Sequence, residues 1–137
     1  MYTHETQLRV RYAETDQMGY AYYGNYAAYY EVARVECIRS LGFSYKKLEE
    51  MGVMLPVLEL HTRYLLPARY DELLTVKVVI PKKPTLKILF QYEILNEAGK
   101  LINQGETTLV FINMETNRPM RMPEVMGKLL EPYFSNQ

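Results

Sequence analysis

One long segment with a helical pattern stands among segments that alternate like strands, and this arrangement constrains the fold most strongly. Between Asn25 and Leu41, apolar side chains recur every three or four positions and would share one stripe of a helix: Tyr26, Tyr30, Ala33, Cys37 and Leu41. Asn25 is a favourable N-cap and Gly42 a favourable stop. Apolar residues also occur beyond the stripe, which predicts burial on more than one side.

Five other segments alternate apolar and polar side chains, as half-buried strands do. The first runs from Thr6 to Ala13, and the others span about 58–66, 74–80, 86–94 and 100–114. Short links, including a predicted hairpin turn at 96–99, join the later strands, so neighbours are expected to be antiparallel. Shorter helices are expected at 44–51 and 123–131.

One sheet is therefore available to cover one long helix. The pattern predicts an α+β protein in which a curved antiparallel sheet wraps around the central helix. The 137 residues fit a single domain, residues 1–137. Such a wrap leaves sheet edges unpaired, and edge-to-edge dimerisation would satisfy them.

Composition narrows the possible partners and the compartment. The formal net charge is zero, which gives no indication of nucleic acid or of an acidic membrane surface as a partner. Cys37 is the only cysteine, so no intrachain disulfide or cysteine-pair metal site can form, and a reducing cytoplasm is expected. No apolar run is long enough to span a bilayer, and residues 1–5 lack the pattern of a secretory signal.

The strongest chemical indication lies in the loop from Glu14 to Gly24. This loop places Asp16 three residues before Gly19 and then leads into the long helix. A helix start offers unpaired N–H groups and about half a positive charge, which suit a carboxylate reaction partner and a developing oxyanion. Gly19 and Gly24 permit a sharp turn and close approach of a ligand. The structural alternative is that Asp16 only caps a turn.

These motifs resemble the 4-hydroxybenzoyl-CoA thioesterase family, whose members are hot-dog acyl-CoA thioesterases. The matching segments are Arg11-Tyr12, Thr15-Asp16-x-x-Gly19, Tyr23-Gly24-Asn25-Tyr26, Tyr30-Glu31-x-Ala33-Arg34 and Pro67–Glu72. The match extends from about Thr6 to Met114. The resemblance implies a hot-dog fold, hydrolysis of acyl-CoA without a metal or other cofactor, and an active site at a homodimer interface. It also implies a homotetramer built from two such dimers.

The resemblance also implies roles for particular residues. Asp16 matches the catalytic carboxylate, which acts as nucleophile or as general base. Tyr23 matches the position whose backbone N–H binds the thioester oxygen. Further candidate substrate-binding residues are Gly19, Tyr22, Gly24 and Tyr26 near the acyl group, and Arg63, Lys82 and Lys83 for the phosphates of CoA.

Several other side chains have simpler interpretations. A solvated turn is the alternative for each lysine, and Tyr26 and Tyr30 are expected in the core before the pocket. Glu31 is expected to pair with Arg34 on the helix surface. His61 is expected to be structural or exposed, and Cys37 is expected to be inert packing.

Three other functions stay open on the sequence alone. An acyl carrier protein thioesterase would use the same chemistry on a protein-bound acyl group. A hot-dog dehydratase or hydratase usually pairs a histidine with an acid, and His4 and His61 are both distant from Asp16 in the sequence. A non-catalytic acyl-CoA-binding dimer would bind ligand without turnover. The sequence does not specify the acyl group.

Overall fold

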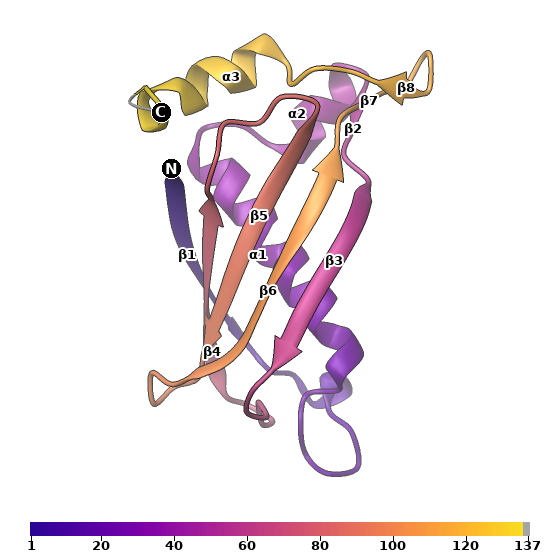
Figure 1. The fold of residues 1–137 in the computed structure, drawn as a ribbon. Coiled ribbons are helices and arrows are strands. Elements are labelled where there is room, and N and C mark those ends of the chain that lie inside the picture. The colour runs from indigo at the N-terminus through magenta and orange to yellow at the C-terminus, as the bar shows by residue number, and fades with distance from the viewer. Residues whose placement is uncertain (136–137) are drawn as a thin grey trace.

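A computed structural model describes residues 1–135 (Figure 1). In chain order its elements are β1 (Tyr2–Arg9), the 3₁₀ helices η1 (Tyr12–Glu14) and η2 (Tyr23–Asn25), α1 (Tyr26–Ser40), α2 (Tyr45–Glu50), β2 (Val53–Met54), β3 (Val57–Tyr64), β4 (Leu73–Ile80), β5 (Lys87–Leu95), β6 (Leu101–Val110), β7 (Ile112–Asn113), β8 (Arg118–Pro119), α3 (Glu124–Leu130) and η3 (Glu131–Tyr133). Among residues 1–135, no helix is both long and apolar enough to cross a membrane.

A five-stranded sheet with the order β1-β4-β5-β6-β3 curves around α1. Each neighbouring pair of strands is antiparallel, and β2, β7 and β8 form a second, small antiparallel sheet. The helix α3 crosses the end of the sheet where β4 turns into β5 (Figure 1). The α+β hot-dog arrangement expected from the sequence is confirmed.

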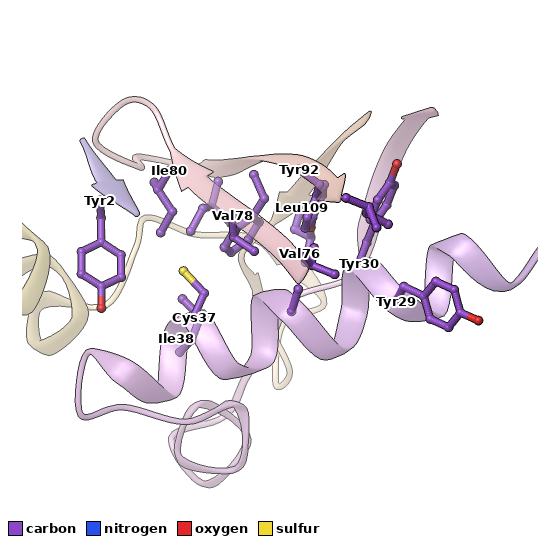
Figure 2. Packing of buried hydrophobic residues seen from close by; sticks show 14 of the residues in the cluster. Tyr2, Tyr29, Tyr30, Cys37, Ile38, Val76, Val78, Ile80, Tyr92 and Leu109 are labelled. Atoms are coloured by element: carbon purple, nitrogen blue, oxygen red, sulfur yellow. The ribbon is translucent and has the colours of Figure 1, made fainter. Parts of the chain in front are cut away.

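The core lies between the inner face of the sheet and α1. Alternate residues of β4 and β5 point inward and are fully or almost fully buried: Leu74, Val76, Val78, Ile80, Ile88, Phe90, Tyr92 and Ile94. Cys37 and Ile38 of α1 pack beneath β4 (Figure 2), while the ring of Tyr30 stacks on that of Tyr92 with centroids 4.2 Å apart. One face of α1 is buried from Tyr26 to Ile38 and fixes the helix against the sheet. Residues such as Ala28 and Val32 on the opposite face are exposed, so the prediction of burial on more than one side is wrong for this chain.

The predicted stops of α1 and α2 and the predicted cap of α2 are confirmed. Gly42, just after α1, and Gly52, just after α2, have φ angles of +87° and +81°, the left-handed conformation that terminates helices. The side chain of Ser44 caps α2 by accepting a hydrogen bond from the amide of Lys47 at 3.1 Å. The final helix occupies 124–130, within the predicted range.

Three local predictions are wrong. The first strand starts earlier than predicted and ends at Arg9, because residues 12–14 turn into η1. The predicted last strand is interrupted at Phe111, between β6 and β7. Asn25 precedes α1 but makes no side-chain cap. Its backbone is already helical, and its Nδ2 instead donates to the carbonyl of Glu14 at 2.7 Å.

The predicted surface pair of Glu31 and Arg34 is also wrong. Glu31 is exposed, whereas Arg34 is only 7% exposed, and no ion pair joins them within the described chain. Arg34 follows Tyr30 by four positions, so it lies on the buried stripe of α1 and its side chain packs inward.

Candidate active site

The loop between η1 and η2 folds back on itself as a small hairpin. The amide of Asp16 donates to the carbonyl of Tyr20 at 2.8 Å, and the amide of Gly19 donates to the carbonyl of Asp16 at 3.0 Å. Thr15 and Ala21 face each other as an antiparallel bridge. Gly19 has a φ angle of +78°, which a residue with a side chain adopts only with strain. The loop therefore has a defined conformation.

The side chain of Asp16 is oriented by the loop that carries it. Its Oδ1 accepts hydrogen bonds from the amides of Met18, at 2.9 Å, and Tyr20, at 3.2 Å. Its Oδ2 accepts no hydrogen bond from any group in residues 1–135. Asp16 does cap a turn, as the structural alternative predicted, but it does so with one oxygen only. The other oxygen stays available for chemistry.

The helix start supplies free hydrogen-bond donors. The turn η2 leads directly into α1, with the amide of Tyr26 donating to the carbonyl of Tyr23. Within the described residues, the amide groups of Tyr23 and Gly24 donate no hydrogen bond. They belong to the unsatisfied N–H groups expected where a helix begins, which favour a negatively charged partner.

A cavity of about 300 Å³ joins the carboxylate to this helix start. Its walls are mostly apolar and aromatic and consist of Asp16, Met18, Tyr20, Ala21, Tyr23, Tyr26, Tyr64, Leu65, Leu66 and Pro67. The hydroxyl of Tyr64 donates to the carbonyl of Tyr23 at 3.1 Å and so ties β3 to η2. The cavity thus places an acidic side chain and an aromatic wall beside the first residue of η2.

The sequence did not single out the wall contributed by Tyr64, Leu65 and Leu66. The signal was present, since the alternation along β3 places Tyr64 on the same side of the strand as Thr62, toward the helix. The segment after β3 also supports the loop. The amide of Ala21 donates to the carbonyl of Ala68 at 2.8 Å, and the guanidinium of Arg69 lies 4.9 Å from the centroid of the Tyr20 ring.

The predicted acyl-pocket residues occupy different positions. Tyr26 is 3% exposed and lines the cavity, whereas Tyr22 does not line it. The ring of Tyr22 lies over Gly24 and against the ring of Tyr23, at a centroid distance of 4.5 Å. A Cβ atom on Gly24 would lie 2.7 Å from the Tyr22 ring, so the glycine makes this close packing possible.

The predicted CoA-binding residues lie elsewhere in the same protomer. Lys82 and Lys83 are exposed on the turn between β4 and β5, at the opposite end of α1 from the Asp16 loop (Figure 1). Arg63 is on the outer face of the sheet, where it lines a larger hollow of about 870 Å³. This hollow is larger than the Asp16 cavity, but neither Asp16 nor the helix start lines it. The smaller cavity is therefore the candidate active site.

The histidines are not part of this cavity. His61 lines the outer hollow, and its Nε2 lies 4.0 Å from a carboxylate oxygen of Glu59. No group of three or more histidine, cysteine, aspartate or glutamate side chains suited to a metal ion occurs in residues 1–135.

The end of β3, an edge strand of the main sheet in the described residues, lines the cavity. The edge strand β3 exposes Leu58 and Leu60 by 54% and 40%, and Tyr64, which lines the cavity, by 49%. Leu65 and Leu66 continue this exposed apolar strip into the cavity wall. Exposed apolar residues along a long edge strand mark a surface for pairing with another chain.

Comparisons with known proteins agree with this fold and show the family. Residues 10–130 match the model of the thioesterase-like superfamily. YneP of Bacillus subtilis is 35% identical over 121 residues, which cover 88% of each chain. The acyl-CoA thioester hydrolase YbgC of Escherichia coli is 31% identical over 117 residues, covering 85% of this chain and 87% of YbgC. A crystal structure of DHNA-CoA thioesterase from Staphylococcus aureus is 40% identical, with a TM-score of 0.85, and the match covers 99% of this chain and 86% of that one.

Proposed function

The chain belongs to the thioesterase-like superfamily and is a thioester hydrolase, and from this premise we propose that it hydrolyses acyl-CoA at the Asp16 cavity. The observation that carries the proposal is the cavity itself. It brings a carboxylate with one free oxygen to the start of a helix whose first amides are unsatisfied. The products are the free acid and CoA.

The proposed chemistry divides between the carboxylate and the amides. Oδ2 of Asp16 either attacks the thioester carbon, expelling the CoA thiolate and leaving an anhydride that water cleaves, or removes a proton from an attacking water. In both routes, negative charge develops on the thioester oxygen. The amides of Tyr23 and Gly24 would stabilise that charge as an oxyanion hole, in which one donor typically contributes about 10²–10³ in rate.

The remaining assignments are also proposals. Gly19 and Gly24 would allow the acyl group close to the backbone, Tyr26 would contact it, and Tyr22 would hold η2 in place. The tyrosine at position 23 supports placement in the 4-hydroxybenzoyl-CoA thioesterase family, as does the motif from Thr15 to Gly19. The buried, unpaired Cys37 fits the proposed cytoplasmic location.

We further propose that the working unit is a homodimer formed through β3, with a dimer of dimers as the larger assembly. Support comes from the exposed apolar strip along β3, which runs directly into the cavity wall. With a twofold axis at this edge, the β3 strands of the two protomers would lie antiparallel to each other. The lysine turn of the partner would then approach the cavity end of this protomer. In such an assembly, Lys82, Lys83 and Arg63 would contact the phosphates of CoA.

The proposal is tested by measuring CoA release from a panel of aromatic, short branched and long straight acyl-CoA substrates, with the matched acyl carrier proteins alongside. We expect hydrolysis of at least one acyl-CoA, with kcat/KM higher than for the same acyl group on the carrier protein. A preference for the carrier would support the acyl carrier protein alternative. Hydration of an enoyl-CoA without hydrolysis, or binding without turnover of any substrate, would contradict the proposal.

A further inference from the structure

Glu14, the residue where η1 ends, has no role in the proposed chemistry, yet it makes several hydrogen bonds close to the cavity. Its side chain is only 16% exposed. Oε1 accepts hydrogen bonds from the backbone amide of Arg11, at 2.8 Å, and from the hydroxyl of Tyr29, at 3.1 Å. Oε2 accepts from Nε of Arg11 at 3.1 Å. The carboxylate therefore joins the segment after β1 to the first turn of α1.

The main chain of Glu14 makes a second set of connections to the helix start. Its carbonyl accepts hydrogen bonds from the amide of Tyr22, at 2.8 Å, and from Nδ2 of Asn25, at 2.7 Å. Tyr22 immediately precedes the proposed oxyanion donor Tyr23, and Asp16 follows Glu14 by two residues. Both halves of the proposed reaction centre are thus attached to Glu14.

The charge state of this residue favours the same arrangement. Burial raises the pKa of Glu14, but hydrogen bonds from the backbone and side chain of Arg11 and from Tyr29 outweigh it and hold the pKa below its usual value. Burial and the nearby Glu14 charge raise the pKa of Tyr29, so its hydroxyl remains a donor. The carboxylate is ionised at neutral pH, and charge-assisted hydrogen bonds are about twice as strong as neutral ones.

We propose that Glu14 is a positioning residue for hydrolysis, which sets the placement of the Asp16 carboxylate relative to the amides of Tyr23 and Gly24. This inference rests on the proposed function of the cavity. Glu14 does not line the cavity and has no role in bond making. Its effect is on geometry, and a misplacement of 1 Å at a reaction centre can cost about 10²-fold in rate.

The test measures kcat, KM and the urea unfolding midpoint for Glu14→Ala, Glu14→Gln and Tyr29→Phe. We expect Glu14→Ala to lower kcat by about 10- to 10²-fold while KM stays within about threefold, because the change affects the reacting geometry and not substrate binding. Glu14→Gln keeps an acceptor for Tyr29 and for the amide of Arg11, so it should recover part of the lost kcat. Tyr29→Phe removes one hydrogen bond to Glu14 and should lower kcat less than Glu14→Ala does.

Glu36→Gln is the matched control. Glu36 is paired with Arg39 three residues away, as Glu14 is with Arg11, but it lies near the far end of α1. Removing the charge of Glu36 by this substitution should leave kcat unchanged.

The inference is overturned if folded Glu14→Ala has the kcat of the wild type. It is equally overturned if its kcat falls only in proportion to the unfolded fraction, or if KM rises while kcat stays constant. Should Glu14→Ala fail to fold, wild-type kcat in both Glu14→Gln and Tyr29→Phe overturns it. Asp16→Asn is measured in parallel. If Asp16→Asn has the predicted low kcat while the Glu14 variants keep the kcat of the wild type, only this inference is rejected. If Asp16→Asn turns over at close to the wild-type rate, the proposed function and the inference are rejected together.

Discussion

At the scale of single residues, the middle of β6 shows how little free space the core contains. Gly105 faces Tyr30, whose hydroxyl contacts Oδ1 of Asn103 and lies 2.8 Å from the Oγ1 of Thr62. Nδ2 of Asn103 donates to the same Thr62 oxygen at 3.0 Å. A Cβ atom at Gly105 would lie 2.5 Å from the carbonyl oxygen of His61 and closer still to the Tyr30 hydroxyl. The glycine therefore makes room for this buried polar network.

We expect Gly105→Ala to lower the free energy of unfolding by about 1–3 kcal/mol, since the added methyl group must displace Tyr30 or the β3 backbone. Urea denaturation measures the change. Gly127→Ala in α3 is the matched control, because its Cβ would meet only the flexible end of Met122, at 3.2 Å. The control should be neutral or stabilising, by up to about 1 kcal/mol of helix propensity. Equal stability of Gly105→Ala and the wild type would refute the packing argument.

Residue roles were predictable where they followed from local pattern and not where they depended on contacts across the fold. Asp16 and Tyr23 share one cavity because a short loop connects them, and the sequence pointed to that loop. Glu14 was missed because its partners Tyr29 and Asn25 meet it only when the loop folds onto the helix. The pairing of Glu31 with Arg34 failed because helical spacing alone does not tell which side is buried.

At the scale of elements, alternation and turn residues predicted the strands well. The helix and the inward-facing residues of β4 and β5 followed from their periods. Boundaries were less accurate, because the start of β1 is set by pairing of Tyr2 with Ile80, a partner 78 positions away in the sequence. Position in the sheet was not predictable either. The strand β3 lies at the edge of the sheet, beside β6, and this placement determines where the apolar strip is exposed.

This edge placement leads to a prediction about assembly. We expect Leu60→Lys to convert the protein from dimer to monomer, because the substitution places a charge within the apolar strip of β3. Light scattering coupled to size-exclusion chromatography measures the mass. Glu59→Gln on the opposite side of the same strand should remain dimeric. A wild-type protein that is monomeric at micromolar concentration would contradict the proposed dimer. A Leu60→Lys variant that still dimerises would show that the interface lies elsewhere.

At the scale of the whole molecule, the sheet and the helix hold the reaction centre from two sides. The loop after β1 carries Asp16, and the start of α1 carries the free amides. The strand β3 closes the wall through Tyr64 and its hydrogen bond to Tyr23. The long helix fixes this end of the molecule because one face of it is buried against the sheet from Tyr26 to Ile38. The proposed hydrolysis depends on the Asp16 carboxylate, which lines this cavity.

The most direct test is the kcat of Asp16→Asn on the best acyl-CoA substrate. Asparagine keeps an oxygen that can accept the hydrogen bonds from the amides of Met18 and Tyr20, so the loop should retain its shape. It lacks the negative charge that both proposed routes require. We predict that kcat falls by about 10²- to 10⁴-fold with an unchanged unfolding midpoint. A folded Asp16→Asn enzyme that turns over at close to the wild-type rate would contradict the account.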